Sequence, residues 1–109
     1  MTSTPTPTIT LSPAQTSISD VILYPNPSRT GRIAARFRAQ GVVSECNVSV
    51  YTVNYRKIAE GEKIAVFGNE TILDLDRLSG KVLSNGTYIL KIIVPQAGYS
   101  TVRTAIIIR

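Results

Sequence analysis

The sequence contains no histidine, no tryptophan and one cysteine, Cys46. Without histidine, no mechanism that uses an imidazole as general base or as metal ligand is available. A single cysteine excludes a disulfide within the chain and a zinc finger. No apolar run approaches the roughly 20 residues that span a bilayer. Nor does a basic segment lead into an apolar one, so we expect any signal peptide to lie outside this sequence.

Acidic residues are also scarce: seven against twelve lysines and arginines, for a net charge of +5. Four arginines fall within ten residues, namely Arg29, Arg32, Arg36 and Arg38. Such a balance raises the possibility of nucleic-acid binding. A single-strand binder needs aromatic platforms beside its basic groove, however, and the only aromatic residue here is Phe37, which alternates with the arginines. The pattern favours a solvated strand face and no nucleic-acid partner.

The composition changes near Asp20. From residue 2 to 19, thirteen of eighteen positions are Ser, Thr or Pro, which leaves little to bury and predicts an extended linker or arm over residues 1–19. Residues 8–11 (Thr-Ile-Thr-Leu) alternate and are β-prone, so they could add a strand to the sheet edge of a neighbour. Residues 20–109 are enough for one domain.

After Asp20 nearly every segment alternates between apolar and polar residues, the period of a half-buried strand. Seven strands are predicted, at residues 21–24, 31–38, 46–53, 57–64, 69–75, 86–94 and 99–109. The predicted inward residues are Ile33, Phe37, Val48, Val50, Leu73, Leu75, Tyr88, Leu90 and Ile92, with Ile106 and Ile108 in the last strand. Helix is limited to one turn at residues 76–79.

Seven short strands within about ninety residues, separated by turn signals, predict an all-β, immunoglobulin-like antiparallel β-sandwich. Because tryptophan and a cysteine pair are missing, it is not an antibody-type domain. A small closed barrel is the alternative architecture.

Few residues carry catalytic or ligand-binding chemistry. Glu60 and Glu62 alternate on one predicted strand, which favours an exposed face over a glycosidase pair. Asp74 and Asp76 could contribute to a calcium site, but Ca²⁺ takes six or more oxygen ligands and two acids beside a turn favour simple solvation. Cys46 lies among strand residues as a small hydrophobe. We therefore expect no enzyme activity, no catalytic, cofactor-binding or metal-binding residues, and no cofactor.

Three N-glycosylation sequons begin at Asn47, Asn69 and Asn85. About one is expected by chance at this content of Asn, Ser and Thr, so the excess is mild. Whether any of the three carries a glycan stays open at this point.

Four segments together resemble a known family. Residues 24–27 read Tyr-Pro-Asn-Pro, residues 48–51 Val-Ser-Val-Tyr, residues 54–58 Asn-Tyr-Arg-Lys-Ile and residues 86–92 Gly-Thr-Tyr-Ile-Leu-Lys-Ile. In this order they resemble the Ig-like C-terminal modules of secreted bacterial proteins, except that Tyr55 stands where the family usually has glycine. The resemblance covers residues 20–109.

The family has two forms, the sorting domain of the type IX secretion system and the Ig-like domain named after the flagellar hook-capping protein FlgD. Residues 80–86 resemble the G-x-x-(V/L)-x-x-G connection of the FlgD form, although the preceding W-D-G motif is missing. Residues 73–78 resemble the I-x-L-x-x-L run of sorting domains, and the Ile-Ile-Ile-Arg ending at residues 106–109 also suits that form.

The resemblance implies a non-catalytic C-terminal module of an exported bacterial protein, secreted or at the cell surface, which serves sorting and surface attachment or docking. Its partners would be the secretion or anchoring machinery. One alternative is a structural subunit of an extracellular filament, assembled when the arm completes a neighbour's sheet, with homo-oligomers formed through edge strands. Another alternative is a carbohydrate-binding module, for which exposed aromatic residues are needed.

Overall fold

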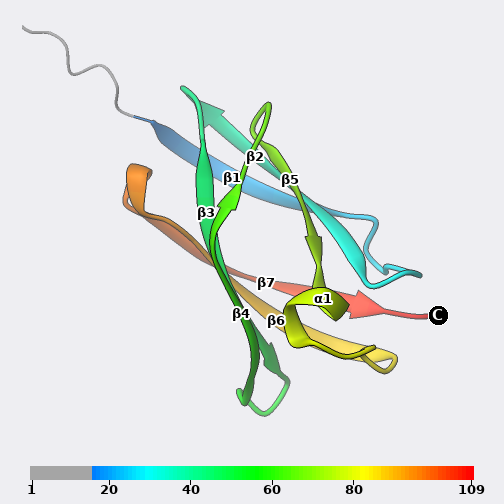
Figure 1. Cartoon of the computed structure of the whole chain (residues 1–109). Helices are drawn as coiled ribbons and strands as arrows, with labels where there is room; N and C mark the ends of the chain where they lie inside the picture. Colours follow the sequence, from blue (N-terminus) through cyan, green and yellow to red (C-terminus); the bar gives the residue numbers. More distant parts are fainter. Residues whose placement is uncertain (1–15) are drawn as a thin grey trace, which may run out of the picture.

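The computed structural model describes residues 16–109, and the predicted strand addition by residues 8–11 lies outside this range. Seven strands form two antiparallel sheets that pack face to face (Figure 1). The three-stranded sheet contains β1 (Ser17–Tyr24), β2 (Arg32–Gln40) and β5 (Glu70–Asp74), in the order β1-β2-β5. The four-stranded sheet contains β3 (Glu45–Thr52), β4 (Lys57–Ala65), β6 (Gly86–Val94) and β7 (Tyr99–Ile107), in the order β4-β3-β6-β7. The predicted all-β sandwich is confirmed.

The strand order differs from that of an antibody constant domain in the place of the fourth strand. There the fourth strand lies beside the fifth in one sheet, whereas here β4 pairs with β3 in the other sheet. Strand β1 begins at Ser17, opposite Gln40, and is therefore four residues longer than the predicted strand at residues 21–24.

The core lies between the two sheets, and most of the predicted inward residues are in it. Fully or nearly fully buried are Ile33, Phe37, Val48, Val50, Leu73, Leu75, Tyr88, Leu90 and Ile92, as predicted. Each alternates with an exposed or half-buried neighbour on its strand, apart from Leu75, which follows the last residue of β5. Period-two alternation therefore located the buried face of four strands, β2, β3, β5 and β6, correctly.

In β7 the predicted inward residues are wrong. Ala105 and Ile107 are fully buried, whereas Ile106 is half-buried and Ile108 is 46% exposed. The register explains the difference, because Ala105 lies opposite the inward Tyr88 on β6, and directly opposite residues share a face of the sheet. Residues 106–108 are all isoleucine, so alternation fits either with Ile107 inward or with Ile106 and Ile108 inward. The sequence alone could not choose between these two arrangements.

Two short helical turns interrupt the strands. The turn α1 (Leu75–Ser79) follows β5, as predicted, and the 3₁₀ turn η2 (Pro95–Ala97) joins β6 to β7. Asp74 caps α1, since its Oδ1 accepts a hydrogen bond from the N–H of Arg77 at 3.2 Å. Within residues 16–109, neither turn has the length or apolar character to cross a membrane.

Tyr55, in the turn from β3 to β4, adopts a left-handed backbone conformation with φ 62°. Its N–H donates to the carbonyl oxygen of Thr52 at 2.9 Å, which closes the turn. Glycine enters this region at no steric cost. The geometry therefore accounts for the glycine that the resembling family usually has at this position.

Candidate functional site

The Tyr-Pro-Asn-Pro motif, residues 24–27, and the serine that follows it run alongside the end of β7. Both hydrogen-bond to the β7 backbone. The side-chain amide of Asn26 donates to the carbonyl oxygen of Thr104 and accepts from the N–H of Ile106, both at 2.9 Å. The backbone of Ser28 continues this pairing: its N–H donates to Ile106 O at 2.7 Å, and its O accepts from Ile108 N–H at 2.9 Å. We call residues 24–28 the motif segment. Its hydrogen bonds occupy the end of the free edge of β7.

A second contact joins β7 to β1. Arg103 occupies an inward position on β7, opposite Leu90, and its guanidinium reaches Asp20 on β1 at 2.8 Å. The same guanidinium donates to the carbonyl oxygen of Val21 at 3.4 Å. Its hydrogen bond holds the pKa of Asp20 below the ordinary value. We call this flank of the sandwich, from β1 to β7, the closed side.

Asp76 was a weak calcium candidate, and the structure pairs it with an arginine instead. Arg109 Nη2 lies 2.6 Å from Asp76 Oδ1, and this hydrogen bond lowers the pKa of the carboxyl group. The same oxygen accepts the N–H of Leu83 at 2.9 Å. Gly31 lies against this pair, where a Cβ would come within 2.8 Å of the Asp76 carboxylate. Asp76 thus holds the Arg109 guanidinium, which also donates to the carbonyl oxygen of Thr30 in the loop before β2 at 3.1 Å.

Asp74 is engaged elsewhere. Its Oδ2 lies 3.4 Å from Arg32 Nε, while its Oδ1 caps α1. Asp74 and Asp76 therefore contact different arginines. Within residues 16–109, no three acidic or cysteine side chains come together as a metal-binding group.

Glu60 and Glu62 are exposed on β4, as their alternation predicted. Glu60 forms an ion pair with Lys57 at 3.0 Å, which raises the pKa of the lysine. The carboxylate of Glu60 is thereby committed to a surface ion pair rather than to a partner acid across a cleft.

The arginines of β2 line the outer face of the three-stranded sheet. Arg32, Arg36 and Arg38 are exposed, while Phe37 between them is 3% exposed and belongs to the core. The predicted orientation is confirmed for this strand. No aromatic residue of β2 is therefore available to stack on a base.

Cys46 is fully buried on β3, opposite Ile64 of β4. Burial raises the pKa of its thiol to about 11, because the thiolate would lose its hydration. The thiol therefore stays protonated at neutral pH, as suits a small core residue.

The side-chain amides of the three sequon asparagines all take part in the fold. The Oδ1 of Asn47 accepts the N–H of Lys63 at 2.8 Å, and that of Asn85 accepts the N–H of Arg109 at 2.9 Å. Asn69 uses both ends of its amide on the backbone of the loop between β2 and β3. These asparagines therefore have structural roles that explain them without a glycan.

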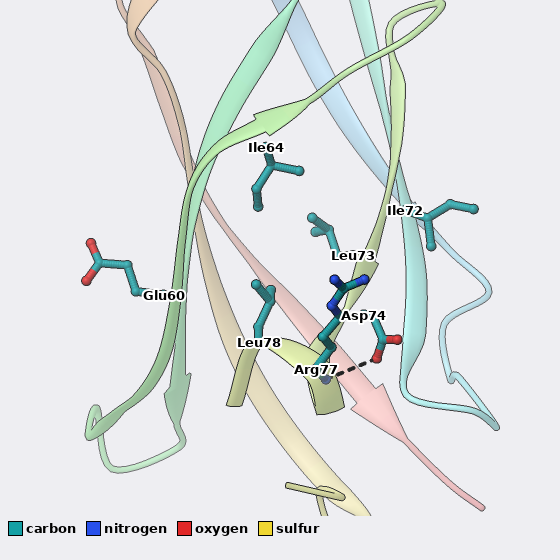
Figure 2. A pocket seen from close by; sticks show the side chains of 7 residues that line it. All are labelled: Glu60, Ile64, Ile72, Leu73, Asp74, Arg77 and Leu78. Atoms are coloured by element: carbon teal, nitrogen blue, oxygen red, sulfur yellow. Dashed lines mark hydrogen bonds between the residues drawn. The ribbon is translucent and has the colours of Figure 1, made fainter. Parts of the chain in front are cut away.

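The opposite flank of the sandwich, between β4 and β5, holds a groove of about 450 Å³ (Figure 2). Ile64 of β4, Leu73 of β5 and Leu78 of α1 form its apolar floor. Figure 2 shows Ile64 and Leu78 directed into the space between the strands and the Arg77 side chain extending from α1 toward Leu73. We call this flank the open side.

No motif in the sequence indicated this groove, because its residues come from β4, β5 and α1. Gly61, inside β4, was the one local signal, since glycine within a strand often marks a close approach of another segment. A Cβ at Gly61 would lie 2.8 Å from Leu78 Cδ2, so the missing side chain lets α1 pack against β4.

Two solved structures share this fold. One is PorZ of Porphyromonas gingivalis, described as an essential bacterial surface component of the type IX secretion system, with a TM-score of 0.57 and 21% identity. The other is dimeric latent PorU of the same organism, with a TM-score of 0.55 and 24% identity. Each match covers 82% of this chain, but only 11% of PorZ and 9% of PorU. No family model matches the sequence, and no curated protein matches it.

Proposed function

We propose that this chain is a non-catalytic Ig-like module of an exported bacterial protein, recognised by the type IX secretion machinery and used for attachment or docking at the cell surface. The observation that carries the proposal is the fold likeness to PorZ, in which a region of this size is one part of a much longer surface protein. The motifs of residues 24–27, 48–51 and 86–92 support the same assignment.

The geometry also supports a structural reading of the most distinctive motif. The hydrogen bonds of Asn26 and Ser28 hold the last strand in place, so the motif segment maintains the module rather than forming a binding surface. Recognition then falls to surfaces on the rigid sandwich, where loops and edges carry function.

The test is export of a reporter. A red fluorescent protein with a signal peptide is fused upstream of residues 1–109 and produced in Porphyromonas gingivalis and in a strain lacking the type IX system. We expect surface-exposed reporter in the first strain and periplasmic reporter in the second. Reporter confined to the periplasm in both strains would overturn the proposal.

A matched pair of variants tests whether export requires the folded module. Ile107→Ala removes buried side-chain volume from the core and should lower export, whereas Ile108→Ala changes an exposed residue and should leave export unchanged. Equal loss in both variants would indicate that the reporter responds to the changed C-terminus and not to the folded module.

The filament alternative needs a sheet edge that can accept the arm. The motif segment covers the end of the β7 edge, and β4 carries charged residues and register shifts that hinder pairing, whereas the edge of β5 beside Ile72 is unpaired. The carbohydrate-binding alternative needs neighbouring exposed aromatics, but the most exposed ones come from separate places: Tyr24 ends β1, and Tyr55 and Phe67 lie at opposite ends of β4. Neither alternative has an observation that favours it over the proposed function.

A further inference from the structure

One edge of β5 borders the groove and is unpaired beyond the Phe67–Glu70 bridge at its start. On its other edge β5 pairs with β2: Phe37 N–H donates to Asn69 O, and Leu75 N–H donates to Gly31 O. Because hydrogen-bonded pairs alternate in an antiparallel ladder, odd-numbered residues from 69 to 75 bond to β2 and even-numbered ones point away. Ile72 therefore directs its N–H and C=O to the open side, where no strand of the described chain pairs with it.

The floor of the groove suits apolar side chains. A strand placed beside β5 would put the residue opposite Ile72 on the outer face and its two neighbours over the floor, since successive side chains point to opposite faces. Those two neighbours would meet Leu73 and Leu78, with Ile64 beside them on the floor.

The charges at the rim favour an acidic group near α1. Glu60 is paired with Lys57 and Asp74 with Arg32, so both rim carboxylates have a cationic partner. Arg77 also lines the groove and forms no ion pair with any residue of the described chain, residues 16–109. A carboxylate on a bound segment would form an ion pair with Arg77.

From this juxtaposition we infer that the open side binds an extended segment of a partner protein by β-strand addition to β5. The segment pairs with the backbone of Ile72, places two apolar residues, spaced i and i+2, on Leu73 and Leu78, and brings a carboxylate to Arg77. The groove volume is in the usual range for binding sites. The inference does not depend on export by the type IX system.

The test uses a phage-displayed library of linear heptapeptides panned against the immobilised full chain. We expect enriched peptides with two apolar residues in alternation and an Asp or Glu within two positions of them. A synthetic copy of the most enriched peptide, titrated into ¹⁵N-labelled protein, should shift the amide resonances of Ile72, Leu73 and Leu78 most.

Matched variants separate backbone pairing from side-chain contact. Ile72→Pro removes the N–H at the edge and should abolish binding, whereas Ile72→Thr keeps it and should retain affinity within about threefold. Arg77→Gln should weaken an acidic peptide by about fivefold, as for an exposed charge pair. The same change should leave the affinity of its amide counterpart unchanged.

The folded state of each variant is checked by its melting transition before binding is measured. The inference is overturned if panning enriches no such pattern. It is also overturned if the peptide binds Ile72→Pro as tightly as the unmodified protein, or shifts resonances on another face. If export of the reporter fails while the peptide still binds at β5, the proposed function falls and the binding site stands.

Discussion

On each flank of the sandwich an edge strand of one sheet lies beside an edge strand of the other. The closed and open sides differ in what connects these two strands. On the closed side, the side chains of Arg103 and Asn26 and the backbone of Ser28 bridge β1 and β7. On the open side, β4 and β5 are held apart by α1 and leave a groove over an apolar floor. An unpaired edge is a liability for a soluble domain. The contacts that bridge β1 and β7 are consistent with a stabilising role for the closed side, and the uncovered edge of β5 on the open side is where we infer binding.

The largest expected effect concerns the strand that completes the closed side. Ile107→Ala should cost about 2–5 kcal/mol of unfolding free energy, through lost transfer energy and a cavity. Ile108→Ala, one residue further along and exposed, should cost less than about 0.5 kcal/mol. Chemical denaturation of both variants checks the difference, and the reverse order would show that the register of β7 is shifted by one residue.

Next in size is the loss of the motif-segment amide. Asn26→Ala removes two hydrogen bonds to the β7 backbone and should cost about 1–2 kcal/mol. Asn54→Ala, in an exposed turn, is the matched control and should be neutral. If Asn26→Ala is equally neutral in a denaturant titration, the motif segment does not stabilise the closed side.

The pH dependence should come from carboxylates whose partners are arginines. Arg109 lowers the pKa of Asp76 from 3.8 in the folded state, so its contribution is present above the unfolded value and is lost as the pH falls through the folded one. The melting temperature should therefore drop below about pH 4. Asp76→Asn should flatten that drop while lowering stability at pH 7. If Asp76→Asn leaves the loss of melting temperature at low pH unchanged, that loss comes from other carboxylates, of which Asp20 is the first candidate.

The smallest effect on stability is expected for the arginines on the outer face of the three-stranded sheet. Changing Arg32, Arg36 and Arg38 together to Ser should move the melting temperature by no more than about 3 °C, because exposed charges and surface ion pairs contribute little. Unfolding of this triple variant would show that the arginines belong to a network that also supports β1 and β5.

The sequence predicted the strands and the buried faces well, because alternation is a local property. Phe37, for example, is buried between the exposed Arg36 and Arg38, as strict alternation requires. The phase of β7 was wrong because Ile106 and its neighbours are all apolar, and only the register with β6 decides between them.

The candidate site could not be predicted, since it depends on partners distant in the chain. Asn26 bonds to residues about eighty positions away, and nothing beside it in the sequence announces them. The groove likewise brings together Ile64 and Leu78 from separate elements. Gly61 marked the close packing there, but a glycine alone does not say which segment approaches it.

The closed side also determines how the module bears mechanical force. Ser28 pairs with the end of β7 in parallel, and the start of β1 and the end of the chain lie at opposite ends of the sandwich (Figure 1). A pull applied to Thr16 and Arg109 therefore runs along both segments and shears the bonds of Asn26 and Ser28 together rather than breaking them one after another. We expect a module built this way to resist being drawn apart along its long axis.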